Sequence, residues 1–202
     1  MKKFAIILAA GKSRRMGFCK TSLTWIDGQT LLTYQTQEWI LAGFTPVVVL
    51  GPHNQDKAKY SCSDSLIVVN HHANLGKVSS ILTGLNYISE DFDVLAISAV
   101  DQPRSHKVYQ KLYQSHEDNS ALISIPTYKD KMGHPLLFSH QMRKNLQSIK
   151  EETLGLRQII QEFNSQINRV YFDDSQILLD MNTPSVYQES LLSVNHIKSF
   201  SS

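Results

Sequence analysis

Short apolar runs separated by segments with helical spacing are the feature of this chain that most restricts its fold. The runs cover residues 4–8, 47–50, 66–69, 94–98 and 121–125. Runs of this length without alternating polar positions are typical of strands that are buried on both faces. Because helix-like segments separate most of them, the pattern predicts an α/β fold with a mostly parallel, Rossmann-like sheet and helices on both faces.

The segments between the runs carry helix signals. Thr30 is a candidate N-cap for a helix that ends near Gly43, and residues 79–88 and 107–113 have comparable spacing. Thr183-Pro184 places a capping residue directly before a proline that suits the first turn of a closing helix. These signals predict helices between the strands and one at the end.

Size, charge and cysteine content restrict the class of protein. The chain has 202 residues and no repeat or linker, so we expect one domain over 1–194 and a flexible tail over 195–202. A net charge of +2 predicts neither a nucleic acid nor a membrane as partner. Cys19 and Cys62, with no export-type segment after Lys2-Lys3, predict a reducing compartment, the cytoplasm.

A loop with little side-chain bulk and several cations follows the first apolar run. Ala9, Ala10 and Gly11 allow main-chain N–H groups to approach an anion, and Arg15 and Lys20 can contact phosphate oxygens. The loop matches neither G-x-G-x-x-G nor G-x-x-x-x-G-K-[ST], and such a turn is often only a solvated connection. Taken with the rest of the chain, it favours a polyphosphate site.

Two acidic residues follow short apolar runs far apart in the sequence. Asp101 comes directly after residues 94–100, and Asp180 follows 177–179, which we read as a short strand. Carboxylates at the carboxyl edge of a sheet, opposite a phosphate loop, suit Mg²⁺ that bridges protein and polyphosphate. The alternatives are that Asp101 only opens a turn, and that Asp180 and Asn182 only organise the start of the last helix.

A third polar segment precedes the helix predicted near residue 79. Gly76, Ser79 and Ser80 place a glycine and two hydroxyl groups at a helix N-terminus, where exposed N–H groups suit a nucleotide. Ordinary capping by Ser79 explains the same residues without a ligand.

Together these motifs resemble the molybdenum cofactor cytidylyltransferases, within the molybdenum cofactor guanylyltransferase-like superfamily, whose fold is that of the nucleotide-diphospho-sugar transferases. The matching pieces lie in the family's order between residue 5 and about residue 187. They are Leu8-Ala9-Ala10-Gly11-x-Ser13-x-Arg15-Met16-Gly17 with Lys20, Gly76-x-x-Ser79-Ser80-Ile81, Asp101-Gln102-Pro103, Gly133-His134-Pro135-x-x-Phe138 and Asp180-x-Asn182-Thr183-Pro184.

The resemblance implies a role for each matching residue. It assigns catalysis to Lys20, Arg15 and Asp101, with Mg²⁺ on Asp101 and on Asp180 or Asn182. The implied nucleotide-binding residues are Leu8, Ala9, Ala10, Gly11, Arg15, Lys20, Gly76, Ser79, Ser80 and Asp101. It assigns the acceptor to Gln102 and His134, and the alternative for His134 is a histidine that only orders its loop. From its position, we expect the irregular segment 127–156 to shape the second substrate's pocket.

The implied reaction is transfer of CMP from CTP to the phosphate of molybdopterin, with release of pyrophosphate. Ala-Ala-Gly in the first loop is more typical of members that use CTP than of the guanylyltransferase branch. A molybdoenzyme or its chaperone is the implied protein partner. Two alternatives stay open, namely the same chemistry on a sugar or polyol phosphate, and a nucleotide-binding accessory protein without catalytic activity.

Overall fold

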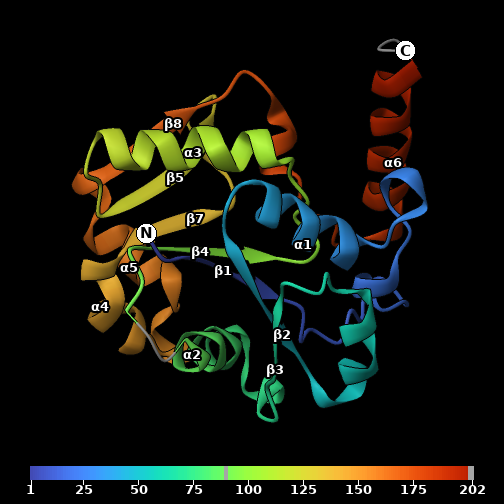
Figure 1. Ribbon diagram of the computed structural model, residues 1–202, viewed down its shortest axis with the longest axis horizontal. Helices are drawn as coiled ribbons and strands as arrows, with labels where there is room; N and C mark the ends of the chain where they lie inside the picture. Colours follow the sequence, from blue (N-terminus) through green and yellow to red (C-terminus); the bar gives the residue numbers. More distant parts are fainter. Residues whose placement is uncertain (89–90, 200–202) are drawn as a thin grey trace.

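One mixed sheet organises the chain (Figure 1). Its strands contain the predicted apolar runs 4–8, 47–50, 66–69 and 94–98, and the fifth run, 121–125, overlaps a strand that begins at Ile123. The computed structural model describes residues 1–88 and 91–199. The strands in this part are β1 (Lys3–Leu8), β2 (Thr45–Leu50), β3 (Leu66–Val69), β4 (Val94–Ala99), β5 (Ile123–Tyr128), β6 (Lys131–Met132), β7 (Leu136–Ser139) and β8 (Ile167–Tyr171). Their order is β3-β2-β1-β4-β7-β5-β6, and β8 pairs with β5.

The half of the sheet that contains β1 is parallel. β1 pairs in parallel with both β2 and β4, so that Ile6 lies opposite Val47 on one side and Ile97 on the other. β2 and β3 are parallel as well, as are β5 and β8. The carboxyl ends of β1, β2 and β4 therefore meet at one edge, where open α/β sheets bind their ligands.

Segment 127–156 differs from its prediction. It supplies β6 and β7, and β7 inserts antiparallel between β4 and β5. The physical reason is that residues 136–138 are three consecutive buried apolar residues, which suit the interior of a sheet. The segment is thus part of the sheet and its cover, and none of the residues 127–156 lines the pocket described below. Contact of this segment with a second substrate stays a prediction.

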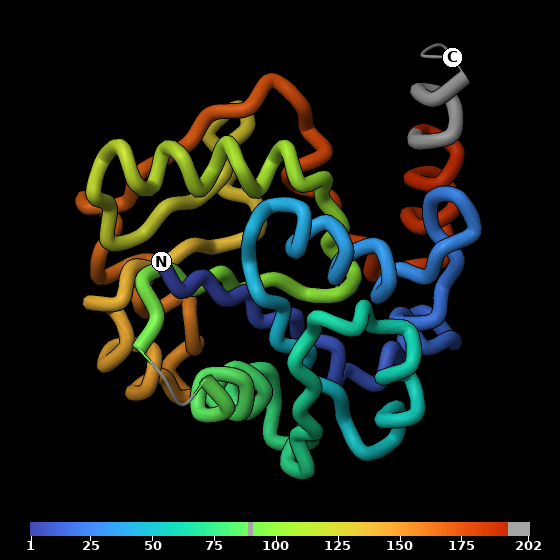
Figure 2. Tube along the Cα trace, in the orientation of Figure 1, coloured from blue at the N-terminus to red at the C-terminus, as the bar shows by residue number. Residues whose placement is uncertain are grey.

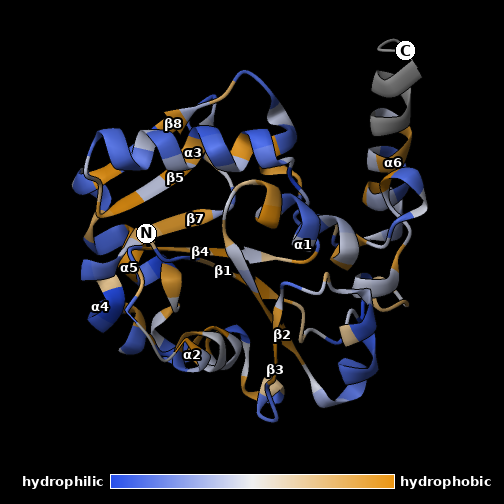
Figure 3. Cartoon of the chain, viewed as in Figure 1, coloured by the Kyte–Doolittle hydropathy of each residue, from blue (hydrophilic) through white to orange (hydrophobic). Residues whose placement is uncertain are grey.

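Helices cover both faces of the sheet. They are α1 (Leu31–Leu41), α2 (Lys77–Tyr87), α3 (His106–Asp118), α4 (Arg143–Gln147), α5 (Leu156–Glu162) and α6 (Pro184–Ser199). α1 and α3 lie on one face, and α2, α4 and α5 lie on the other (Figure 1). Hydrophobic residues follow the strands, whereas hydrophilic residues are prominent on the outer helices (Figure 3). This doubly covered α/β architecture confirms the predicted fold class.

Each face of the sheet has its own apolar core. Between α1 and α3, the ring of Trp39 stacks on Tyr109 with centroids 3.6 Å apart, and both side chains are fully buried. On the opposite face, α2 packs so closely at Gly84 that an added Cβ would lie 3.0 Å from methyl groups of Ile6 and Val49. The first contact joins α1 to α3, and the second fixes α2 against β1 and β2.

The last helix begins beside the loop that follows β1 (Figures 1 and 2). The Oγ1 atom of Thr183 accepts from the N–H of Val186 at 3.4 Å, as expected for the predicted cap, and the hydroxyl of Tyr187 donates to the carbonyl of Thr24. α6 continues to residue 199, into the segment expected to be a tail, while residues 200–202 lie outside the described residues. Flexibility of this segment stays a prediction. In the described part of the chain, no helix has the length and apolar character needed to cross a membrane.

Buried His116 gives the fold an acid-sensitive group. Its Nδ1 atom lies 2.8 Å from Oγ of Ser124, and burial lowers the pKa of His116 from 6.5 to about 4. Since the unfolded chain takes up this proton near pH 6.5, stability is lost as the pH falls from 6.5 to 4. We expect this residue alone to lower the free energy of unfolding by about 3 kcal/mol over that range.

Denaturant unfolding of the wild type and His116→Gln at pH 7, 5.5 and 4 tests this expectation. The difference in unfolding free energy between the two proteins should shrink as the pH falls. Other titrating groups, including His134, are common to both proteins and cancel in the comparison. A difference that does not change with pH contradicts the assignment.

Candidate active site

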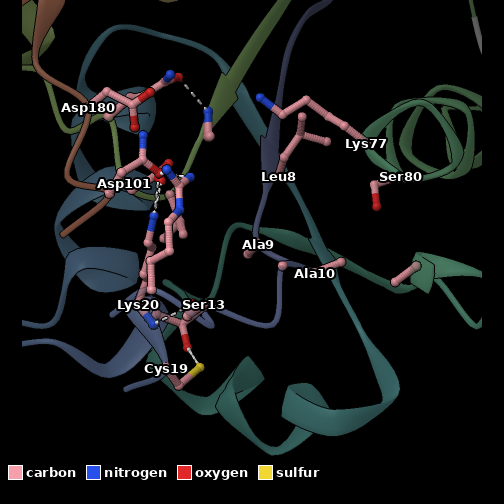
Figure 4. A pocket seen from close by; sticks show the side chains of 18 of the residues that line it. Leu8, Ala9, Ala10, Ser13, Cys19, Lys20, Lys77, Ser80, Asp101 and Asp180 are labelled. Atoms are coloured by element: carbon pink, nitrogen blue, oxygen red, sulfur yellow. Dashed lines mark hydrogen bonds and ion pairs between the residues drawn. The ribbon is translucent and has the colours of Figure 1, made fainter. Parts of the chain in front are cut away.

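A pocket of about 450 Å³ opens at the carboxyl edge of β1 and β4 (Figure 4). It is formed by the loop after β1, the start of α2, the turn after β4 and the segment before α6. The lining residues are Leu8, Ala9, Ala10, Gly11, Ser13, Arg15, Cys19, Lys20, Thr21, Ala73, Gly76, Lys77, Ser80, Ala99, Val100, Asp101, Gln102, Asp180 and Asn182. All the residues predicted to bind nucleotide except Ser79 are in this set, whereas His134, predicted to contact the acceptor, is not.

The loop after β1 is held by the neighbouring loop after β2. The N–H of Ala9 donates to the carbonyl of Val49 at 2.9 Å, which extends the parallel ladder by one residue. The Nδ2 atom of buried Asn54 donates to the carbonyl of Ala9 at 2.9 Å, and its Oδ1 accepts from the N–H of Gly51 at 2.8 Å. Asn54 therefore fixes one wall of the pocket, although no sequence motif singled it out.

Cations from the first loop meet polar groups from two distant segments. The ammonium group of Lys20 forms an ion pair with Asp101 and donates to Oδ1 of Asn182 at 3.0 Å. The same Oδ1 accepts from the guanidinium of Arg15 at 3.3 Å. The side chains of Lys20 and Asp101 are only 12% and 13% exposed, so their interaction is weakly screened by water. The structure thus brings positions 15, 20, 101 and 182 to one corner of the pocket.

The two predicted acidic residues both line this pocket. Partial burial raises the pKa of Asp180, as does repulsion from Asp101, while the ammonium group of Lys20 opposes the shift. A divalent cation would relieve that repulsion, and Asp101, Asp180 and Asn182 offer the oxygen donors that Mg²⁺ and Mn²⁺ prefer. In the described residues, no cluster of three or more His, Cys, Asp or Glu could hold a metal alone, so substrate oxygens would complete the shell.

Asp180 does not follow a strand, contrary to the prediction. Residues 175–178 form a short 3₁₀ helix. Main-chain carbonyls of this segment, which would bond to a neighbouring strand in a sheet, instead accept from the buried guanidinium of Arg104. Arg104, 3% exposed, donates from Nη2 to the carbonyls of Ile177 at 2.8 Å and Leu179 at 2.7 Å. Burial lowers the pKa of Arg104 to about 10, which leaves it charged at neutral pH. Arg104 therefore positions the segment that carries Asp180.

Replacing Arg104 with methionine is expected to lower the free energy of unfolding by about 3 kcal/mol, because two buried carbonyls lose a charged donor. It should also weaken nucleotide binding, since the segment from Ile177 to Asn182 loses its anchor. Thermal denaturation and nucleotide titration check both effects, with exposed Arg157→Met as the matched control. Wild-type stability together with wild-type nucleotide affinity would show that Arg104 has no positioning role.

The start of α2 differs from the expected backbone site. The carboxylate of Glu151 accepts from the N–H of Val78 at 2.8 Å and from that of Lys77 at 3.4 Å. At Gly76, where φ is +111°, an added Cβ would clash with the same carboxylate. These N–H groups are therefore already paired within the protein, and the sequence contained no signal that Glu151, 74 residues further on, would pair with them.

The serines at the start of α2 point in different directions. Ser79 donates to the carbonyls of His72 at 2.9 Å and Gly76 at 3.0 Å, so its hydroxyl group belongs to the local turn. Ser80 lines the pocket, and its Oγ accepts from Nδ2 of Asn70 at 3.0 Å. The prediction of capping by Ser79 is wrong, because Gly76 is the N-cap of α2 without a side-chain cap bond and Ser79 lies inside the helix. The hydroxyl of Ser79 is taken up by the turn, and Ser80 is left available to a ligand.

The two residues assigned to the acceptor lie differently from each other. Gln102 lines the pocket, but its Oε1 accepts from the N–H of Ala99 at 3.0 Å, which closes the turn that carries Asp101. His134 lies outside the lining set and its N–H donates to the carbonyl of Ile177 at 3.2 Å. Direct contact of either side chain with an acceptor stays a prediction.

Residues 5–169 match the MobA-like NTP transferase domain, and the chain belongs to that family. This finding confirms the family resemblance seen in the motifs.

Two curated relatives align with most of the chain. It is 26% identical over 188 residues to nicotine blue oxidoreductase of Paenarthrobacter nicotinovorans, which covers 88% of the chain and 91% of the relative. It is 22% identical over 196 residues to the bifunctional protein GlmU of Staphylococcus saprophyticus, which covers 93% of the chain. The chain spans only 44% of the length of GlmU.

Several solved structures share the fold. The homologue of Rv0371c from Mycobacterium sp. strain JC1 superposes with a TM-score of 0.83 and 24% identity, covering 98% of this chain and all of that one. A manganese complex of Rv0371c from Mycobacterium tuberculosis superposes with a TM-score of 0.77 and 19% identity, covering 96% of this chain and 100% of that one. A CMP:2-keto-3-deoxy-manno-octonic acid synthetase complexed with CTP superposes with a TM-score of 0.76 and 11% identity, covering 97% of this chain and 99% of that one. At these identities the likeness concerns the fold.

Proposed function

We propose that the protein transfers CMP from CTP to the phosphate of molybdopterin and releases pyrophosphate, in a reaction that depends on Mg²⁺. The observation that carries this proposal is the meeting of Arg15 and Lys20 with Asp101 and Asp180 around one pocket. Membership of the MobA-like NTP transferase family supports the reaction class. The choice of CTP rests on Ala9-Ala10-Gly11, which resembles the cytidylyltransferase branch, and a protein of the same fold has been solved with CTP.

The metal proposal has its own support. Two carboxylates and an amide oxygen, from the turn after β4 and the segment before α6, line the pocket, and a protein of the same fold has been solved with manganese. Asp101 and Asp180 would hold the ion, and Asn182 would add an oxygen. When bound, the ion would neutralise charge on the phosphate groups of the nucleotide.

The residues of the pocket suit a direct displacement at phosphorus. An ionised phosphate oxygen of the acceptor forms a bond to the α-phosphorus, the bond from that phosphorus to the bridging oxygen breaks, and pyrophosphate leaves with the electron pair. Such a nucleophile needs no general base, so catalysis rests on positioning and on charge neutralisation. We assign the triphosphate to Arg15 and the α-phosphate to Lys20, which would exchange Asp101 for a phosphate oxygen.

A thermal-shift panel of CTP, GTP, UTP and ATP, each with and without Mg²⁺, tests nucleotide choice. At a hundred times the Kd, we expect CTP with Mg²⁺ to raise the Tm by about 5–10 °C, and more than any other nucleotide does. Equal shifts for all four, or none, would contradict the proposed CTP specificity.

Pyrophosphate release then tests the acceptor. With CTP present, release should require molybdopterin and should not occur with sugar or polyol phosphates. Release with a sugar phosphate would favour the alternative acceptor class. Binding of CTP without release for any acceptor would favour a nucleotide-binding accessory protein.

A further inference from the structure

A third cation faces the pocket from the wall opposite the first loop. Lys77, at the start of α2, lines the pocket, and Figure 4 shows its side chain extending across the cavity from α2. Lys20 is paired with Asp101, whereas Lys77 has no ion-pair partner among the residues that the structure describes. Within the described residues, this exposed ammonium group is thus directed into the site without an ion-pair partner, although its charge also acts on Asp180 by lowering the pKa of that carboxyl.

The backbone beside Lys77 cannot provide the same function. Glu151 already accepts from the N–H groups of Lys77 and Val78, so the start of α2 offers no free main-chain donor at these two positions. Positive charge on this wall therefore comes from the side chain of Lys77.

The charge of Lys77 acts on His134, a residue whose pKa also responds to Asp101. The pKa of His134 is lowered to about 4, mainly by burial and also by the charges of Lys77 and Arg104, while Asp101 opposes the shift. His134 is thus neutral at physiological pH, and Lys77 is the cation that α2 contributes near it.

The reaction of the proposed function needs two separate sites for negative charge. In an in-line displacement, the attacking phosphate and the leaving pyrophosphate lie on opposite sides of the α-phosphorus. Arg15 and Lys20 form one cationic wall, and Lys77 lies on the other. An attacking phosphate without a cation beside it would be repelled by the triphosphate.

We propose that Lys77 binds the attacking phosphate group of the acceptor, a phosphate monoester, on the wall opposite Arg15 and Lys20. This inference rests on the proposed function and adds to it the residue that selects the second substrate. A hydrogen bond from an ammonium group to phosphate orients the attacking oxygen as well as neutralising it.

The test uses Lys77→Met, an unbranched side chain one atom shorter and without the charge, and Lys77→Arg, which keeps the charge. Lys107→Met, on an exposed position of α3 outside the pocket, is the matched control. With molybdopterin as acceptor, Lys77→Met should raise the KM for the acceptor about 10- to 100-fold, the range for one lost hydrogen bond to a charged group. The Kd for CTP should stay within about twofold, by the standing uncertainty of such comparisons.

Partial recovery of the acceptor KM in Lys77→Arg, with no change in Lys107→Met, supports the proposal. An unchanged acceptor KM in Lys77→Met overturns it. A loss of CTP affinity as large as the loss of acceptor affinity also overturns it, because Lys77 would then belong to the nucleotide site.

Chemical labelling tests whether Lys77 binds phosphate without measuring enzymatic turnover. Lysines of the wild-type protein are acetylated at limiting reagent, with inorganic phosphate or with sodium chloride at equal ionic strength, and the sites are quantified by mass spectrometry. Phosphate should slow acetylation of Lys77 and leave Lys107 unchanged. Equal protection of both lysines, or of neither, overturns the binding role. If CTP does not bind the wild type at all, the proposed function fails, and the labelling result still decides whether Lys77 binds phosphate.

Discussion

Replacing Lys20 with alanine is expected to lower turnover about 10²–10³-fold, the usual effect of removing one preorganised donor from a developing charge. The reason is that Lys20 is the most enclosed cation of the pocket, with its ammonium between Asp101 and Asn182. Initial rates of pyrophosphate release under saturating CTP and acceptor measure the effect.

Two controls separate this loss from a change in the fold. Lys12→Ala removes a cation from the same loop at an exposed position that does not line the pocket, and it should keep wild-type turnover. Circular dichroism of Lys20→Ala should match the wild type. A folded Lys20→Ala protein with turnover within a few-fold of wild type would falsify the role given to this residue.

Asp101→Asn is expected to reduce turnover by about 10²-fold or more, because the variant loses the charge with which Asp101 would hold a divalent cation. The side chain keeps its size, and Asp180 then faces no neighbouring carboxylate, so the fold should persist. Rates measured across a range of Mg²⁺ and Mn²⁺ concentrations should show a higher metal requirement in the variant.

The matched control for Asp101 is Asp130→Asn. Asp130 is exposed, lies outside the pocket and has a positive φ of 64° that asparagine accepts. We expect this variant to keep the metal dependence of the wild type. If Asp101→Asn keeps it too, Asp101 is not a metal ligand.

The parallel half of the fold could be predicted from sequence because its signals are local. The apolar runs at 47–50 and 66–69 lie within β2 and β3, and Thr30 caps α1 with its Oγ1 accepting from the N–H of Thr33. A continuous apolar run can only be satisfied inside a covered sheet, so strand identity and fold class follow from it.

The antiparallel insertion could not be predicted, since it depends on pairing between distant segments. Residues 136–138 read as apolar, but their place between β4 and β5 is set by contacts across the sheet. The misreading of 177–179 as a strand has the same origin, because Arg104 binds their carbonyls from 73 or more residues away.

The candidate site also contains some residues that could be predicted from sequence and others that could not. Arg15, Lys20 and Asp101 carry charge in recognisable motifs, so sequence alone indicated them. The positions of Lys77 beside the pocket and of Glu151 at the start of α2 are set by the tertiary fold, and neither residue stood out in its own segment. Motifs therefore indicate the groups that hold charge, and the fold decides which backbone donors remain free.

The central claim is that one divalent cation and one triphosphate share the pocket formed by the first loop and the two acidic residues. A crystal structure with Mn²⁺ and a non-hydrolysable CTP analogue tests it most directly, because anomalous scattering locates the metal without reference to the chain. We expect a single manganese peak coordinated by Asp101 and Asp180, with the triphosphate against Arg15 and Lys20. A peak elsewhere, or a nucleotide bound outside this pocket, would contradict the account.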